Sequence, residues 1–121
     1  MLLTSEREKP LSPSSAHEIS HDDFRTLIQN QSALIIDARG PEQFAEGHVR
    51  GAINVPAGEM EDYAASKLQN VDRSQPIVLY CSSQTCHASE MVYEYLVGQG
   101  FTNMRVYSPG WLVLKSARDM L

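Results

Sequence analysis

Two uninterrupted apolar runs constrain the fold of this chain more than any other feature. The segments ALII (33–36) and IVLY (77–80) contain no charged residue, and each ends abruptly, the first at Asp37 and the second at Cys81. A strand with one solvent-facing side alternates apolar and polar residues, whereas a strand covered on both faces reads as a continuous apolar run. The two runs therefore predict a parallel sheet with helices on both faces.

Helical patterns separate the predicted strands. The segment 88–97 repeats its apolar residues at the spacing of one helix face, namely at Ala88, Met91, Val92, Tyr95 and Leu96. Further helices are expected at 21–30, 41–47, 58–70 and 110–121, and short strands at 17–20, 52–56 and 104–108. This alternation predicts an α/β domain with a mainly parallel sheet.

The length of 121 residues suits one domain with its own core. Residues 1–16 are rich in serine and proline and are predicted to form a flexible tail, which leaves 17–121 as the domain.

A net charge of −5 disfavours nucleic acid as a partner. The sequence contains no run of about 18 apolar residues, so no membrane span is expected. The N-terminal residues lack the apolar region of a signal peptide, so we expect a cytoplasmic protein with reduced thiols.

The segment CSSQTCH (81–87) is the strongest candidate for a functional loop. Cys81 follows a predicted buried strand, at the carboxyl edge of the sheet where functional loops gather. Successive backbone amides in such a loop, with a helix N-terminus behind them, can bind an anion. Two or three charge-assisted amide hydrogen bonds would lower a thiol pKa by roughly two units. We therefore expect Cys81 to be largely a thiolate.

The chain resembles the rhodanese-like domain, a sulfurtransferase family, from about Ile19 to Ala117. The resemblance rests on motifs in a fixed order: Asp37-x-Arg39, Phe44-x-Glu46-Gly47-His48, Gly51-Ala52-x-Asn54, the strand–Cys81–loop–helix unit, Gly100-Phe101 and Gly110-Trp111. It implies five mainly parallel strands with helices on both faces. It also implies a nucleophilic Cys81 that carries a persulfide sulfur from a small-molecule or protein donor to a thiol or other nucleophilic acceptor, without a cofactor.

The family's loop has six residues counted from the nucleophile, here Cys81 to Cys86. The predicted persulfide cradle is formed by the backbone amides that follow Cys81, those of Ser82, Ser83, Gln84, Thr85, Cys86 and His87. The family pattern has a central glycine, an arginine at the sixth place and then a serine; this chain has Gln84, Cys86 and His87. Without the arginine we expect weak thiosulfate activity. The same gap disfavours related phosphatases and arsenate reductases, which need an arginine to bind a dianion.

Cys86 has two interpretations. It is either a resolving thiol, which would form a disulfide with Cys81, or a small residue packed where the helix begins. A Cys/Cys/His metal site lacks a fourth ligand, so no metal is expected. Two alternatives to sulfur transfer stay open: a non-catalytic or regulatory binding module, and a thiol-redox enzyme that uses both cysteines.

Charged residues near the loop are further candidates. Asp37 and Arg39 form either a structural pair or part of the pocket, and Arg50 is a candidate for the missing cation. His48 is expected to be mainly architectural, and His87 would donate to a bound anion when protonated. Trp111 is predicted to anchor the closing helix in the core.

Overall fold

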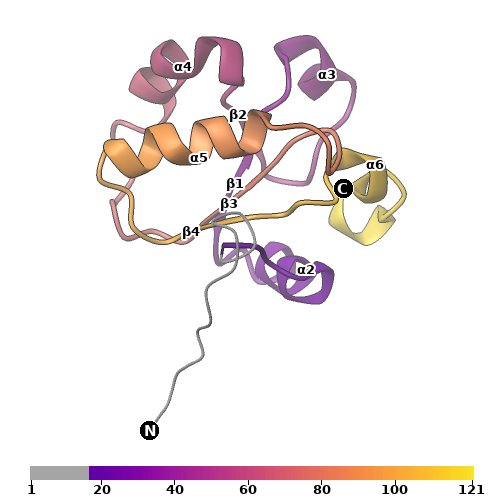
Figure 1. Ribbon diagram of the computed structural model, residues 1–121. Helices are drawn as coiled ribbons and strands as arrows, with labels where there is room; N and C mark the ends of the chain where they lie inside the picture. The colour runs from indigo at the N-terminus through magenta and orange to yellow at the C-terminus, as the bar shows by residue number, and fades with distance from the viewer. Residues whose placement is uncertain (1–16) are drawn as a thin grey trace, which may run out of the picture.

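The computed structural model describes residues 17–121, and the predicted tail at 1–16 lies outside the described residues. Four strands form one sheet: β1 (Leu34–Asp37), β2 (Ile53–Asn54), β3 (Ile77–Tyr80) and β4 (Met104–Val106). Their order is β2-β1-β3-β4, and every neighbouring pair is parallel. The parallel α/β architecture is confirmed (Figure 1). None of the helices within the described range is long and apolar enough to cross a bilayer.

The expected fifth strand at 17–20 is reduced to a single parallel bridge between Glu18 and Val106. Val106 exchanges two backbone hydrogen bonds there, donating to His17 and accepting from Ile19. Pairing stops because Ser20 caps the next helix, accepting a 3.1 Å hydrogen bond from the Asp23 amide. The N-cap conformation ends the strand after one bridge.

The helices connect the strands in alternation. They are α2 (His21–Gln29), α3 (Pro41–Glu46), α4 (Met60–Lys67), α5 (Ala88–Gly98) and α6 (Trp111–Leu114), with 3-10 turns η1 (Ala57–Glu59) and η2 (Arg118–Met120). The prediction of a single closing helix is wrong. Ala117 adopts φ −91° and ψ 79°, and this conformation separates α6 from η2.

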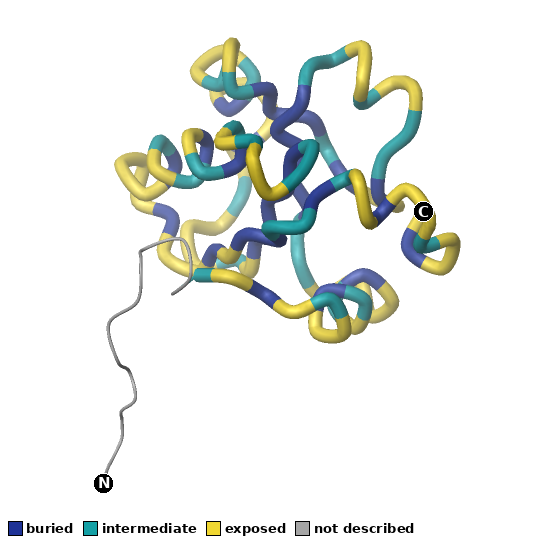
Figure 2. The backbone as a smooth tube through the Cα atoms, turned by 45° about the vertical axis from the view of Figure 1, so that its right-hand side comes forward, coloured by how far each residue is buried: buried dark blue, intermediate teal, exposed yellow. Residues whose placement is uncertain are grey.

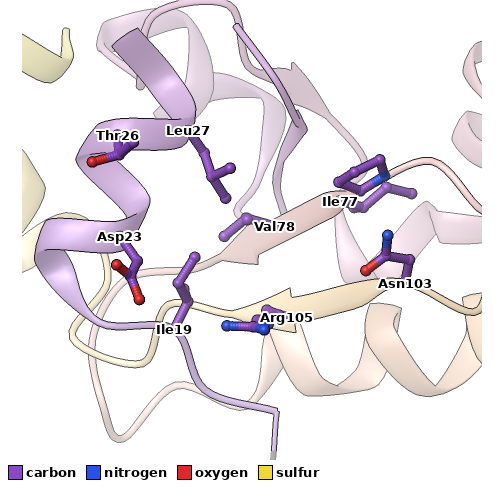
Figure 3. Close-up of a pocket in the computed structure, with 9 residues that line it drawn as sticks. Ile19, Asp23, Thr26, Leu27, Ile77, Val78, Asn103 and Arg105 are labelled. Atoms are coloured by element: carbon purple, nitrogen blue, oxygen red, sulfur yellow. The ribbon is translucent and has the colours of Figure 1, made fainter. Parts of the chain in front are cut away.

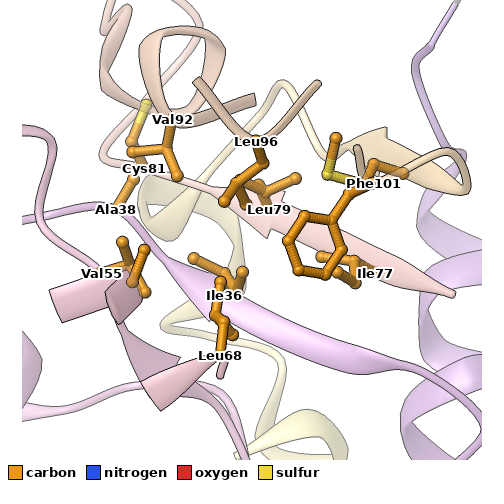
Figure 4. Close-up of a cluster of buried hydrophobic side chains, with 12 residues drawn as sticks. Ile36, Ala38, Val55, Leu68, Ile77, Leu79, Cys81, Val92, Leu96 and Phe101 are labelled. Atoms are coloured by element: carbon orange, nitrogen blue, oxygen red, sulfur yellow. The ribbon is translucent and has the colours of Figure 1, made fainter. Parts of the chain in front are cut away.

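The sheet separates two hydrophobic clusters. On one face, residues of α4 and α5 pack on the buried side chains of β1 and β3, and Cys81 belongs to this cluster (Figure 4). On the other face, α2, α6 and η2 cover the sheet. The buried residues lie along the central strands, and the outer helix faces are exposed (Figure 2). Both faces of the sheet are covered, as the continuous apolar runs predicted.

Helix α5 packs on the sheet with a face slightly different from the one predicted. Its buried residues are Ser89, Val92 and Leu96, whereas Met91 is 52% exposed. The spacing of three and four residues among the buried set is that of one helix face. This face places Ser89, in the first helical turn, beside the loop that follows β3.

Candidate functional site

Cys81 directly follows β3 at the carboxyl edge of the sheet, as the sequence predicts. The loop turns back on itself through a 3.1 Å hydrogen bond from the Cys86 amide to the Ser83 carbonyl oxygen. Helix α5 then begins at Ala88, with His87 in the N-cap position. Cys81 is only 2% exposed, so the thiol lies beneath the loop rather than at its surface.

The sulfur of Cys81 contacts two groups across the loop. Its thiol donates to the Cys86 carbonyl oxygen at 3.3 Å, and it lies 3.4 Å from the Ser89 hydroxyl oxygen. Ser89 was missed as a candidate from the sequence. The sequence signal that could have identified Ser89 is its position in the first turn of the predicted helix, on the same face as Val92 and Leu96.

Both cysteine sulfurs have backbone donors nearby: the Ser89 amide acts on Cys81, and the amides of Ser82 and Ala88 act on Cys86. The Ala88 amide donates to the Cys86 sulfur at 3.5 Å. The backbone and side chain of Ser82 also form hydrogen bonds with this sulfur. Among the described residues, the amides of Gln84 and Thr85 have no hydrogen-bond acceptor. Of the amides predicted to bind the Cys81 sulfur, that of Ser82 acts on Cys86 instead.

The two thiols differ in acidity. Burial raises the pKa of Cys81, and hydrogen bonding with Cys86 raises it further, against a smaller opposite effect of Ser89. Burial also acts to raise the pKa of Cys86, but the hydrogen bonds from Cys81, Ser82 and Ala88 outweigh it and lower the pKa. The raised pKa of Cys81 runs against the expectation that it is largely a thiolate, because burial outweighs the hydrogen bonds from the Ser89 side chain and backbone.

The loop is attached to the start of α6. The Trp111 amide donates to the Cys81 carbonyl oxygen at 2.7 Å, and the Leu112 amide donates to the Ser82 carbonyl oxygen at 2.9 Å. Gly110 precedes them with φ +72°, and a β-carbon there would lie 2.7 Å from the Cys81 carbonyl oxygen. Only glycine combines this conformation with so close an approach.

Asp37 and Arg39 form a buried structural pair, and the alternative of a pocket position is wrong for both. The Arg39 guanidinium lies 2.7 Å from the Asp37 carboxylate, and their side chains are 4% and 0% exposed. Arg39 also donates to the Gly47 carbonyl oxygen at 2.7 Å and stacks on the Trp111 ring at 4.6 Å. The Tyr80 hydroxyl donates to Asp37 at 2.8 Å. The pair joins β1 to the segment after α3.

The other charged candidates lie away from the Cys81 sulfur. Arg50 is exposed and lines a cavity of about 240 Å³ against α2, on the opposite face of the sheet from the Cys81 cluster. His87 is exposed, with its ring 3.8 Å from the Glu90 carboxylate. His48 stacks on Phe44 and bonds to its carbonyl oxygen at 2.7 Å, in agreement with the architectural role expected.

Two cavities lie at opposite edges of the sheet. A groove of about 440 Å³ borders the loop and is lined by Ser83, Gln84, Thr85, Pro109, Leu112 and Val113. None of these lining residues carries a charge. A cavity of about 310 Å³ lies instead at the amino ends of β3 and β4, where Asp23 and Arg105 face it (Figure 3). Of these two cavities, only the groove borders the loop, and Cys81 itself does not line it. Residues 17–121 contain no group of three side chains arranged to hold a metal ion.

Comparisons with known proteins identify the family. Residues 20–117 match the rhodanese-like domain. A thiosulfate sulfurtransferase GlpE from Stutzerimonas stutzeri is 31% identical over 100 residues, which cover 83% of this chain and 76% of the relative. Among solved structures, BH2092 from Bacillus halodurans has a TM-score of 0.74 at 19% identity, covering 86% of this chain and 74% of that one. The human single-domain sulfurtransferase TSTD1 has a TM-score of 0.68 at 22% identity, covering 78% of this chain and 91% of that one. The chain belongs to the rhodanese-like domain family of sulfurtransferases.

Proposed function

We propose that this protein transfers sulfane sulfur and that Cys81 carries the sulfur as a persulfide between a donor and a nucleophilic acceptor. The observation that carries the proposal is the position of Cys81 at the carboxyl end of β3, beneath a loop of family length and at the N-terminus of α5. The relative named as a thiosulfate sulfurtransferase supports the reaction class. A helix N-terminus stabilises negative charge on a sulfur placed there.

The first half-reaction requires Cys81 to lose its proton. The thiolate then attacks the outer sulfur of the donor persulfide, and the donor leaves as its own thiolate. Ser89 stabilises the Cys81 thiolate, since its hydroxyl lies 3.4 Å from the sulfur and its hydrogen bonds lower the pKa of Cys81. In the second half-reaction an acceptor nucleophile takes the outer sulfur, and Cys81 again leaves as a thiolate.

The chemistry of the groove favours persulfide donors over thiosulfate. Thiosulfate is a dianion, and its recognition calls for a fixed cation such as a bidentate guanidinium. The groove beside the loop has uncharged lining residues, and its wall includes Leu112 and Val113, which are 60% and 44% exposed. Arg39 is held by Asp37 and Arg50 lies on the other face of the sheet. A small or protein-bound persulfide therefore suits the site better.

The second candidate is a non-catalytic or regulatory rhodanese-like module. The observation in its favour is the burial of Cys81, which is 2% exposed and whose pKa is raised by that burial. Structural buried cysteines are unreactive, whereas catalytic ones are accessible and acidic. The two candidates differ in whether Cys81 accepts sulfur.

Sulfur loading tests the proposal. The reduced Cys86→Ser variant, whose only described thiol is Cys81, is incubated separately with thiosulfate and with a low-molecular-weight persulfide. Its intact mass is then measured. We expect a gain of one sulfur atom from the persulfide, little gain from thiosulfate, and no gain in Cys81→Ser. A folded Cys86→Ser protein that gains sulfur from neither donor would establish the non-catalytic module instead.

A further inference from the structure

We propose that Cys86 is a resolving thiol, which attacks the persulfide on Cys81 and releases its outer sulfur as sulfide. The inference rests on the proposed function, because it needs a sulfur atom loaded on Cys81. It adds a second fate for that sulfur: in the absence of an acceptor, the protein reduces it. An external dithiol would then restore the two thiols and complete a persulfide-reducing cycle.

The first support is the contact between the two cysteines across the loop. The Cys81 sulfur lies 3.3 Å from the backbone carbonyl oxygen of Cys86, and each thiol shifts the pKa of the other. The turn closed by the bond from the Cys86 amide to the Ser83 carbonyl oxygen folds the chain back over Cys81. A disulfide requires the two Cα atoms to lie within about 7 Å, and a chain folded back in this way favours that approach.

The second support is the environment of the Cys86 sulfur, which favours a negative charge. The Ala88 amide donates to this sulfur at 3.5 Å, and Ser82 contributes two further hydrogen bonds. These bonds lower the pKa of Cys86, whereas that of Cys81 is raised. An attacking thiol is most effective when its pKa is close to the ambient pH. The surroundings of Cys86 thus favour the thiolate form that an attack on the Cys81 persulfide requires, and the burial of Cys81 shields a sulfur bound there.

The release step balances in atoms and electrons. The Cys86 thiolate attacks the sulfur of Cys81 in the persulfide Cys81–S–SH, and a bond forms between the two cysteine sulfurs. The bond from Cys81 to the outer sulfur breaks, and the outer sulfur leaves with both electrons as HS⁻. The sulfane sulfur is reduced by two electrons, and the two cysteines are oxidised to a disulfide. A dithiol reductant then exchanges with that disulfide.

Cys86 packs against the edge of the hydrophobic cluster that contains Cys81, but it is not enclosed by it. Inert cysteines are buried in apolar surroundings, which raise their pKa. Cys86 is partly exposed, and its sulfur accepts hydrogen bonds from the polar groups at the start of the loop and of α5. A thiol held in this way is available to attack.

The test compares wild type with Cys86→Ser and Cys86→Ala after loading with one equivalent of glutathione persulfide. Sulfide is measured against a blank without protein, and non-reducing peptide mass spectrometry locates the sulfur. We expect wild type to release about one sulfide per chain and to lose two hydrogens in a Cys81–Cys86 disulfide. Both variants should retain the added sulfur on Cys81 and release no sulfide.

The outcomes distinguish a failure of the resolving role from a failure of the sulfur carrier. If the variants load sulfur and wild type also retains it without a disulfide, the resolving role is wrong and the sulfur carrier stands. If neither the variants nor wild type gain sulfur, the proposal that Cys81 carries sulfur and the proposal that Cys86 resolves the persulfide are both wrong. Loading of wild type on Cys86 alone would likewise overturn the resolving role, because Cys86 would then be the carrier.

Discussion

The backbone amide of Trp111 donates a 2.7 Å hydrogen bond to the carbonyl oxygen of Cys81, so the first residue of α6 holds the first residue of the loop. The preceding residue, Gly110, makes this approach feasible, since a β-carbon there would lie 2.7 Å from the same oxygen. The conformation of the candidate site therefore depends on a contact between segments about thirty residues apart in the chain.

Gly110→Ala is expected to displace the loop from α6. The added methyl group meets the backbone of Cys81, Ser82 and Ser83 at 2.7–2.8 Å, and φ +72° is itself costly for alanine. We expect a loss of stability of about 2–4 kcal/mol in urea unfolding and faster alkylation of Cys81. Gly98→Ala is the matched control, because its β-carbon meets no atom within 4 Å; it should be neutral or slightly stabilising. Equal stability of the two variants would contradict the prediction.

The pH dependence of alkylation should separate the two thiols. The pKa of Cys86 is lowered and that of Cys81 is raised relative to an ordinary thiol. Since only the thiolate reacts, the rate for Cys86 should reach its plateau at a lower pH than a model thiol, and the rate for Cys81 at a higher pH. Iodoacetamide labelling followed by peptide mass spectrometry measures both rates. The reverse order of the two residues would show that the amides serve Cys81 instead.

Ser89→Ala tests the hydroxyl beside the Cys81 sulfur. Its oxygen lies 3.4 Å from that sulfur, and its hydrogen bonds lower the pKa of Cys81. Removing the hydroxyl should raise the pKa further and slow sulfur loading in a Cys86→Ser background by about three- to tenfold at neutral pH, the effect of one hydrogen bond. The rate should recover at high pH, which a purely structural defect would not allow. Ser116→Ala, at an exposed position, should leave loading unchanged.

Arg39→Met tests the structural role of the buried ion pair. The substitution leaves the Asp37 carboxylate buried without its cation, at a side-chain exposure of 0%. We expect a loss of about 3–5 kcal/mol in the free energy of unfolding. Arg25→Met is the control, because its ion pairs with Asp22 and Asp119 lie at the surface and should contribute at most about 1 kcal/mol. If Arg39→Met proved as stable as Arg25→Met, the pair would not be structural.

Cys86→Arg should increase the use of thiosulfate. The substitution introduces a guanidinium at the sixth loop position, beside a groove that is lined by uncharged residues. Charge-assisted hydrogen bonds of about 1.5–3 kcal/mol correspond to roughly tenfold to hundredfold. Steady-state kinetics with thiosulfate and with a persulfide donor would measure the change, and Cys86→Met serves as a control of similar length without charge. If Cys86→Arg and Cys86→Met changed the use of thiosulfate equally, the missing cation would not be the reason for weak thiosulfate activity.

The fold was accessible from the sequence because its main signals are local. The runs 33–36 and 77–80 became β1 and β3, the two central strands, and the apolar spacing of 88–97 became α5. The closing helix was overestimated, since the break at Ala117 is a backbone conformation that no breaker residue marks. The strand at 17–20 shortened to one bridge because the Ser20 cap competes for the same residues.

The position of the site was predictable, but the direction of its side chains was not. The loop and Cys81 lie where the strand end indicated. Which sulfur the amides of Ser82 and Ala88 face is decided by a tight turn at Ser83–Cys86, and residue types do not specify that turn. The contact of Ser89 likewise depends on the helix face that packs on β3, and Met91 at 52% exposure shows that the predicted face was slightly rotated.

The hydrogen bonds from Ser82 and Ala88 to the Cys86 sulfur mean that a side chain of the loop occupies these donors when no substrate is bound. Inorganic anions that are abundant in cells, such as phosphate, sulfate and chloride, would have to displace this tethered sulfur to bind there. The protein should accordingly resist inhibition by these anions at millimolar levels. A donor that reacts with a thiolate does not face this competition, because the internal ligand is itself part of the chemistry.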